Sequence, residues 1–461
     1  MKYRSTRGGV AGVSFLDSLL MGLAEDGGLL LPETIPDVTA SLEAWRSLSF
    51  VELAQQVIAL YVDDIERDQL DELIEQAYAS FSHAEVVALR QLDDIAVLEL
   101  FHGPTLAFKD VALQLVGKLF ELALERNGAH LNILGATSGD TGSAAIAGVR
   151  GQRNIDIFIL YPNNKVSALQ ELQMTTVPDE NVHCIAIEGS FDDCQSLMKN
   201  IFGDLHYKQE MNLGAVNSVN WARVLAQIVY YGYASLRMEG GAHFCVPTGN
   251  FGNVFAGYIA RRMGFPIRQL VVATNENDIL ARFFDSGEYA RSEVHFTLSP
   301  AMDIQVASNF ERFLFYLFDE DSVRLQQFME DFQTHGTATL GDAWQGAAAH
   351  GFLATAIDTE ETLAAVAAAY REHDYVLDPH TAVGVAAASK VRDQLADGQL
   401  VCVGTAHPAK FPEAVQQALP DVTPTHPTLE ALRGLPQRKT VLAADEAVIK
   451  AHIQAHAHSS P

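Results

Sequence analysis

The chain has 461 residues, and its 31 lysines and arginines against 58 aspartates and glutamates give a formal net charge of −27. This length predicts roughly two to four domains. An apolar share of 48% is typical of a folded chain and excludes global disorder. The acidic charge argues against duplex nucleic acid and anionic membranes as partners, because both need a basic surface. Any anionic ligand must therefore be held by local groups.

The four cysteines form no CxxC pair and no zinc-type spacing, so we expect reduced thiols and no metal site. The basic N-terminus MKYRSTRGG lacks the apolar stretch of a secretory signal. No uninterrupted run of about 18 apolar residues marks a transmembrane helix. These observations predict a soluble, cytoplasmic protein.

Residues 1–95 have a mixed character. Apolar residues at three- and four-residue intervals predict helices over residues 13–24, 50–61 and 65–81. A turn-forming DGG and a strand-like LLLP follow the first of them. We interpret this stretch as an N-terminal α+β segment.

Residues 96–300 alternate β-branched runs with Ala- and Gly-rich helical runs, which predicts βαβ units and parallel sheets. A smaller subdomain is expected around residues 135–215. Residues 301–372 indicate a helical insertion, residues 373–425 a return to the core, and residues 426–461 short helices and a tail. The expected strands are IAVLELF, HLNILGAT, IDIFILYP, VHCIAIEG, HFCVPTG, QLVVATN and QLVCVGTAHP.

Lys109 follows a Gly-Pro turn and an apolar run in FHGPTLAFKD, at the start of a helical pattern. Burial among Leu106, Ala107 and Phe108 would disfavour its ammonium form, which is what a Schiff-base lysine requires. The alternative is a surface lysine beside a solvated Asp110. The segment alone does not decide between these two interpretations.

Two loops lie between a strand and a helix. ATSGDTG, residues 136–142, offers hydroxyls and backbone N–H groups suited to a carboxylate, or it is an ordinary N-cap formed by Asp140 or Thr141. PTGNFGN, residues 247–253, matches neither a Walker A loop nor a dinucleotide fingerprint. Its glycines would let the backbone approach a phosphate; otherwise the loop is simply a tight turn.

Two further segments carry polar groups in apolar surroundings. GAVNSVNWAR, residues 214–223, precedes an expected helix, and its polar side chains either line a polar ligand or are structural. They are Asn217, Ser218, Asn220 and Arg223. In GTAHPAK, residues 404–410, Thr405 follows a strand end, where ligands of open α/β sheets bind. We interpret His407 and Lys410 as local structure.

In this order, FHGPTLAFKD, ATSGDTG, NSVNWAR and PTGNFGN make the chain resemble the threonine synthase family, in particular its bacterial and fungal branch. The opening YRSTRG and SFLDSLLMGLAEDGGLLLPE is similar to that family's N-terminal signature. The resemblance extends from Tyr3 to about Pro412. It implies an α/β enzyme of fold type II that depends on pyridoxal 5'-phosphate (PLP), with two open, twisted, mostly parallel sheets flanked by helices.

The resemblance also implies roles for individual residues. Lys109 forms the Schiff base with PLP and moves protons, and Thr405 faces the pyridine nitrogen. The cofactor phosphate is held by the loop of Gly249, Asn250, Phe251, Gly252 and Asn253. The substrate carboxylate and the cofactor edge are held by Ser138, Gly139, Asp140 and Thr141. The substrate phosphate is assigned to Asn217, Ser218, Asn220 and Arg223, with Arg223 favoured for its bidentate guanidinium.

The implied reaction converts O-phospho-L-homoserine and water into L-threonine and phosphate. One alternative is a PLP-dependent lyase that releases phosphate and yields 2-oxobutyrate. Another is a cofactor-binding scaffold without catalysis, although the intact Lys109 and glycine loop argue against it. We expect a monomer rather than a homodimer, and no nucleic acid, membrane or metal as a partner.

Overall fold

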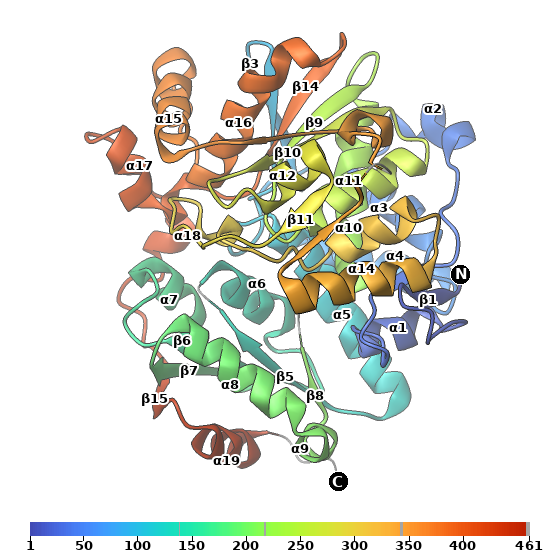
Figure 1. The fold of residues 1–461 in the computed structure, drawn as a ribbon. Coiled ribbons are helices and arrows are strands. Elements are labelled where there is room, and N and C mark those ends of the chain that lie inside the picture. Colours follow the sequence, from blue (N-terminus) through green and yellow to red (C-terminus); the bar gives the residue numbers. More distant parts are fainter. Residues whose placement is uncertain (138, 216–217, 342–343, 458–461) are drawn as a thin grey trace. The chain divides into compact units, whose positions relative to one another are not determined.

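The computed structural model describes residues 1–137, 139–215, 218–341 and 344–457. The chain divides into two compact units, each built from separate stretches of sequence, and Figure 1 shows it coloured from N- to C-terminus. Unit 1 comprises residues 1–75, 81–102 and 218–424; unit 2 comprises residues 76–80, 103–217 and 425–461. The segment boundaries expected from the sequence follow chain order and stay predictions.

The first 95 residues contain the helices and the strand predicted for them. α1 (Phe15–Met21) begins after Ser14, whose hydroxyl accepts the N–H of Asp17. α3 (Phe50–Ala59) begins with a capping box formed by Ser49 and Glu52. The same stretch contains α4 (Arg67–Tyr78), the short helix α2 (Leu42–Trp45) and the antiparallel pair β1 (Tyr3–Ser5) and β2 (Leu30–Pro32).

Unit 1 is built on a six-stranded sheet. Its strands are, in spatial order, β13 (Phe352–Ala356), β10 (Ile267–Thr274), β9 (Ala242–Pro247), β14 (Gln399–Gly404), β4 (Ile95–Glu99) and β3 (Ala88–Leu92). Neighbouring strands are parallel except β3 and β4, which are antiparallel. The sequence predicted β4, β9, β10 and β14. It missed β3 and β13, which form the two edges and are only partly buried.

Helices cover both faces of this sheet. Phe244 on β9 lies 5.0 Å from the ring of Tyr231 on α10 (Trp221–Leu236). α11 (Gly252–Arg262) packs on the same face, because a Cβ on its Gly257 would meet both Tyr231 and Leu270, the register partner of Phe244. The next residue, Cys245, points to the opposite face and packs with α16 (Pro379–Val391).

The segment 301–372 contains the expected helices α13 (Phe310–Leu317), α14 (Ser322–His335) and α15 (Thr359–His373). It also contains β12 (Thr337–Thr339), which pairs with β11 (Glu288–Ala290), and the sheet strand β13. The segment is therefore not only helical. β12 has only three residues, and β13, with the sequence FLATA, does not alternate apolar and polar side chains, so neither shows the pattern of a strand.

Unit 2 is built on a five-stranded sheet that is parallel throughout. Its order is β15 (Thr440–Ala443), β7 (Val182–Glu188), β6 (Ile155–Pro162), β5 (Leu131–Ala136) and β8 (Leu213–Gly214). The two open, mostly parallel sheets confirm the predicted fold class. Two strands of this sheet were missed: β15, because the sequence pattern of the tail indicated helices alone, and β8, because it has only two residues.

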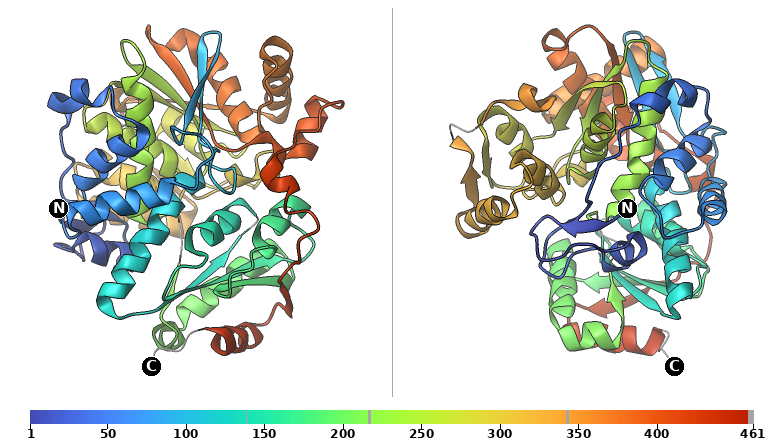
Figure 2. Two further views of the ribbon diagram at one scale, coloured as in Figure 1. Left: turned by 180° about the vertical axis from the view of Figure 1, so that it is seen from behind. Right: turned by 90° about the vertical axis from the view of Figure 1, so that its right-hand side faces the viewer.

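Helices also cover both faces of the unit 2 sheet. α8 (Phe191–Gly203) and the C-terminal helix α19 (Glu446–His456) share one apolar cluster with β6 and β7, and they lie close together in both panels of Figure 2. Cys184 on β7 points to the other face, where its thiol donates to the Met174 carbonyl of α7 (Ala168–Thr175). α5 (Lys109–Asn127) and α6 (Asp140–Val149) pack against each other, and α6 also contacts α7.

Candidate active site

Lys109 is the first residue of α5, directly after a turn that is fixed by its neighbour Asp110. Thr105 donates its N–H at 2.8 Å and its hydroxyl at 2.6 Å to the carboxylate of Asp110, which is fully buried. Gly103 is required in the turn because a Cβ there would overlap the Asp110 side chain. The solvated Asp110 considered above is therefore wrong. Asp110 positions Lys109, a role that sequence reasoning missed.

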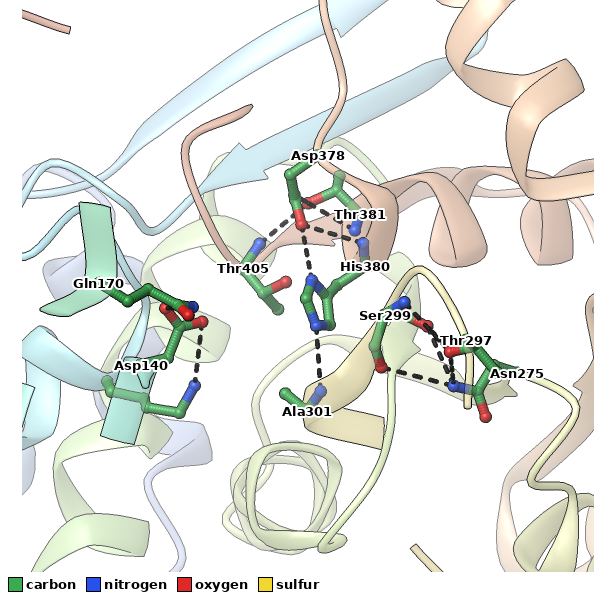
Figure 3. Close-up of polar contacts among 11 residues, drawn as sticks. Asp140, Gln170, Asn275, Thr297, Ser299, Ala301, Asp378, His380, Thr381 and Thr405 are labelled. Atoms are coloured by element: carbon green, nitrogen blue, oxygen red, sulfur yellow. Dashed lines mark hydrogen bonds and ion pairs between the residues drawn. The ribbon is translucent and has the colours of Figure 1, made fainter. Parts of the chain in front are cut away.

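The amine of Lys109 faces a carboxylate. Its Nζ lies 3.9 Å from Oδ2 of Asp140, and the lysine side chain is 11% exposed. Gln170 donates from Nε2 to the other oxygen of Asp140 at 3.1 Å; Figure 3 shows the contact between Asp140 and the lysine amine as a dashed line. The structure thus brings two of the predicted site residues together. A sequestered amine beside a fixed carboxylate is suited to moving protons.

The ATSGDTG loop leads into α6, whose N-cap residue is a glycine and makes no side-chain cap. α6 begins at Asp140, and Gly139 occupies the N-cap position with a φ of 142°. An ordinary N-cap formed by Asp140 or Thr141 is therefore wrong. The hydroxyl of Thr137 accepts the N–H groups of Gly139 at 3.0 Å and Gly142 at 2.9 Å, which fixes the loop from inside.

The PTGNFGN loop is shaped by two tight approaches. A Cβ on Gly249 would lie 2.8 Å from the Ala301 carbonyl oxygen, and Phe251 adopts the left-handed conformation with a φ of 65°. The Phe251 side chain is buried in an aromatic cluster, so only its backbone is available to a ligand. The cluster contains Phe284, Phe310, Phe313 and Phe352.

Asn250 and Ser218, from separate motifs, meet through Ser308. The Ser308 hydroxyl lies 2.8 Å from that of Ser218 and donates to Oδ1 of Asn250 at 3.2 Å. Asn309 donates its backbone N–H to the Asn250 carbonyl and its Nδ2 to the Ser218 carbonyl. These bonds hold the two motifs side by side. Two other predicted residues, Ser138 and Asn217, lie outside the described residues.

Asn253, in the first turn of α11, is oriented by two tyrosines. Its Oδ1 accepts the hydroxyls of Tyr230 at 2.6 Å and Tyr231 at 2.7 Å. Burial raises the pKa of both tyrosines, so they stay neutral donors. The Nδ2 of Asn253 is buried and finds no hydrogen-bond partner among the described residues. Asn253 therefore presents a donor that suits an anion.

Arg223 lies inside the first turn of α10, not before the helix as expected, because α10 begins at Trp221. It is 5% exposed, and in the described part of the chain its Nε and Nη1 have no hydrogen-bond partner. Burial lowers its pKa to about 10, so it is still charged at neutral pH. Asn220 is engaged structurally: Oδ1 caps α10 through Ala222, and Nδ2 donates to the Leu19 carbonyl.

Thr405 follows β14 and is tied to a network around Asp378 (Figure 3). Its hydroxyl is buried without a hydrogen-bond partner in the described ranges, and its N–H donates to the Thr381 hydroxyl oxygen at 3.1 Å. The Thr381 hydroxyl in turn donates to Asp378. Nδ1 of His380 lies 3.0 Å from Asp378, and its Nε2 accepts the Ala301 N–H at 3.3 Å. Sequence reasoning missed this network, because DPHT indicates only a helix start.

Asn275 fixes the turn that carries Ala301. It follows β10, and its Nδ2 donates to Thr297 Oγ1 at 2.8 Å, to Ser299 Oγ at 3.0 Å and to Asp303 Oδ1 at 2.7 Å (Figure 3 shows the first two). The sequence gives no separate signal for this role. Since Ala301 backs Gly249, Asn275 supports the PTGNFGN loop from behind.

Other sequence features have local roles. His407 caps a short helical turn by accepting the Ala409 N–H at 3.2 Å, as expected. The four cysteines are free and buried, and burial raises the pKa of Cys184 to about 12. The described residues form no cluster of three or more His, Cys, Asp or Glu that could hold a metal ion. Within the same ranges, no helix is both long and apolar enough to cross a membrane.

Comparisons with known proteins agree on one family. Models of the threonine synthase N terminus, of pyridoxal-phosphate-dependent enzymes and of the threonine synthase C-terminal region match residues 2–78, 86–405 and 381–453. Threonine synthase of Schizosaccharomyces pombe is 47% identical, with 91% of this chain and 89% of the relative covered. That of Pseudomonas aeruginosa is also 47% identical, with 99% and 98% covered.

Solved structures agree with this result. A PLP-bound threonine synthase from Brucella melitensis matches with a TM-score of 0.96 at 43% identity, covering 99% of this chain and 100% of that one. Yeast threonine synthase matches with a TM-score of 0.94 at 42% identity, covering 99% and 98%. The chain belongs to the threonine synthase family of pyridoxal-phosphate-dependent enzymes.

Proposed function

We propose that the chain binds PLP and converts O-phospho-L-homoserine and water into L-threonine and phosphate. The observation that supports this substrate most directly is the state of Arg223. A buried guanidinium with two unpartnered nitrogens among the described residues suits a phosphate, which accepts paired, charge-assisted hydrogen bonds. The similar proteins from Schizosaccharomyces pombe and Pseudomonas aeruginosa, both threonine synthases, support the reaction.

The residues present fit PLP. Gly249 has no room for a side chain, and its loop leads into the N-terminus of α11, which favours a phosphate. Asn253 adds a buried donor, and the Thr405 hydroxyl suits a neutral ring nitrogen. Lys109 supplies the amine that joins the cofactor. When bound, PLP supplies the electron sink that stabilises a carbanion next to the substrate amine.

The chain's own groups then handle the substrate. Lys109 removes the Cα proton and later returns a proton to Cγ, while Asp140 holds the lysine amine. The Cβ proton is also removed and the Cγ phosphate leaves. Water then adds its hydroxide at Cβ and gives its proton to the departing phosphate, and a proton returns to Cα. Gly139, Asp140 and Thr141, with Ser138, bind the substrate carboxylate. Asn217 and Ser218 join Arg223 at the substrate phosphate, and Asn220 fixes the start of α10.

The first test replaces Lys109. We expect Lys109→Ala to lose both turnover and the visible absorbance of bound cofactor, because Lys109 supplies the amine that joins the cofactor. Lys118→Ala, in the same helix, is the matched control and keeps both properties. An active, coloured Lys109→Ala protein would overturn the assignment.

The products decide between the proposal and its alternative. Elimination of phosphate is common to both reactions, so phosphate release alone is insufficient. Equal amounts of L-threonine and phosphate support the proposal, whereas 2-oxobutyrate without threonine identifies the lyase. A purified protein that stays colourless with added PLP indicates neither enzyme.

We also propose a cytoplasmic monomer. Free, buried thiols fit a reducing compartment, and a net charge of −27 opposes self-association. Sedimentation equilibrium at several concentrations should return the mass of one chain. Twice that mass would show a homodimer.

A further inference from the structure

Asp378 is a buried carboxylate outside the sequence motifs, and it is connected to two parts of the proposed cofactor site. We infer that Asp378 is a positioning residue: through Thr381 it sets the residue that faces the cofactor ring, and through His380 it sets the loop that holds the cofactor phosphate. The inference rests on the proposed function and deepens it. Asp378 itself need touch neither cofactor nor substrate.

The first connection runs to Thr405. Asp378 caps α16 by accepting the N–H groups of His380 at 2.9 Å and Thr381 at 3.3 Å. The Thr381 hydroxyl also donates its proton to Asp378, so its oxygen presents a lone pair to the Thr405 N–H at 3.1 Å. The backbone of Thr405 is thereby fixed at the end of β14, and its own hydroxyl remains available to a ligand.

The second connection runs to the phosphate loop. Because the Asp378 carboxylate can only accept, Nδ1 of His380 carries the proton and Nε2 is the acceptor. The Ala301 N–H donates to this Nε2 at 3.3 Å. The Ala301 carbonyl oxygen lies 2.8 Å from where a Cβ on Gly249 would be, so Ala301 supports the loop directly. Asp378 therefore fixes the His380 tautomer, and this tautomer keeps Ala301 in place behind Gly249.

Asparagine at this position would break the arrangement with almost no change in shape. Its NH₂ group would face either the two donors of His380 or the two donors of Thr381. In the first case His380 must move its proton to Nε2, which can then no longer accept from Ala301. In the second case the Thr381 hydroxyl must turn away, which disturbs its bond to Thr405. One connection is lost in either orientation.

The test compares PLP with pyridoxal, which has the same ring and no phosphate. Each is titrated into the cofactor-free protein and followed by absorbance and fluorescence. We expect Thr381→Val to weaken both ligands by a similar factor, about tenfold, and to shift the absorption band, and Thr381→Ser to restore both. We expect His380→Leu to weaken PLP about tenfold and leave pyridoxal unchanged. Asp378→Asn should show at least one of these two signatures.

A purely structural role predicts a different pattern. It lowers the free energy of unfolding but leaves the ratio of the two Kd values and the absorption band of the folded protein unchanged. Asp393→Asn, an exposed carboxylate just after α16, is the matched control and should bind both ligands as wild type does. If Asp378→Asn does not fold, Thr381→Val and His380→Leu decide the question, because each keeps Asp378.

The outcomes separate the two proposals. The inference is overturned if the Asp378, Thr381 and His380 variants keep both the wild-type ratio of the Kd values for PLP and pyridoxal and the wild-type absorption band. PLP binding by the wild type leaves the proposed function standing in that case. A wild-type chain that binds no PLP overturns the proposed function itself.

Discussion

Arg223 and Arg312 are both buried in unit 1 but differ in their hydrogen bonds. Arg312 donates to the Leu30 carbonyl at 2.9 Å, to Asn309 Oδ1 at 2.6 Å and to the Val219 carbonyl at 2.5 Å. Arg223 has two buried nitrogens with no such partner among the described residues. Burial lowers the pKa to about 9 for Arg312 and to about 10 for Arg223, so both are charged at neutral pH.

Replacing Arg223 or Arg312 by leucine should therefore affect the free energy of unfolding differently. Arg223→Leu removes an unpaired buried charge, so we expect the free energy of unfolding to stay the same or rise by about 1–3 kcal/mol, while turnover is lost. Arg312→Leu leaves three hydrogen-bond acceptors unpaired and should lower the free energy of unfolding by about 3 kcal/mol or more. Urea unfolding of the ligand-free proteins measures both. Equal destabilisation would show that Arg223 is held by the protein itself.

The pH dependence follows from the sign of the shift. The folded-state pKa of Arg223 lies below the ordinary value for arginine, so its charge destabilises the folded state fully below pH 10. This destabilisation is relieved as the pH rises above 10. As the pH rises above 10, the difference in unfolding free energy between wild type and Arg223→Leu should therefore become smaller.

Site residues at helix starts and strand ends could be proposed from the sequence, because backbone groups are free there. Lys109, the Gly249 loop and Thr405 are such cases. Asp378 and His380 could not be proposed in this way, because the sequence DPHT indicates only a helix cap. The bonds of this segment to Ala301 and Thr405 form only when distant segments pack together. Contacts of this kind leave no local signal.

At the level of elements, α5 and α6 approach each other closely through two glycines. A Cβ on Gly117 of α5 would overlap the Gly148 carbonyl oxygen, and one on Gly148 of α6 would lie 2.5 Å from the Leu113 carbonyl oxygen. These helices begin with Lys109 and Asp140. The glycines therefore set the spacing of the two helices that carry the amine and its carboxylate.

Alanine at Gly117 should push the helices apart. We expect Gly117→Ala to lower the free energy of unfolding by about 1–3 kcal/mol, since overlap outweighs the gain in helix propensity, and to weaken PLP binding. Gly203→Ala, on the exposed end of α8 with nothing near its Cβ, is the control and should leave stability unchanged or slightly raised. A Gly117→Ala protein with unchanged stability and PLP binding would show that α5 and α6 are not tightly spaced.

Elements differed in how far they could be predicted. Buried parallel strands such as β6, which is buried at every position, read as continuous apolar runs and were found. The edge strands β3, β13 and β15 were missed, because they are short and partly exposed. Their identity depends on a neighbouring strand that the local sequence does not reveal.

At the level of the whole molecule, unit 2 is completed by the end of the chain. β15 adds to the sheet beside β7, and α19 buries Ile449 and Ile453 against α8. No local pattern indicates that residues 425–461 belong with residues 103–217, so this organisation could not be predicted.

The C-terminal helix should therefore stabilise unit 2. We expect Ile453→Ala to lower the free energy of unfolding by about 2–5 kcal/mol and to speed hydrogen exchange in β7 and α8. Val448→Ala, at a 41% exposed position of the same helix, should change stability by less than about 0.5 kcal/mol. Equal effects of the two variants would argue that α19 is only loosely attached.

The position of β14 also shapes how the chain folds during synthesis. β14 lies between β9 and β4 in the sheet of unit 1, yet it follows every other strand of that sheet in the chain. Until the ribosome has released residues 399–404, β4 and β9 each present an unpaired apolar edge. From residue 247, where β9 ends, to residue 399, where β14 begins, the nascent chain therefore carries two aggregation-prone edges, and one late insertion closes both.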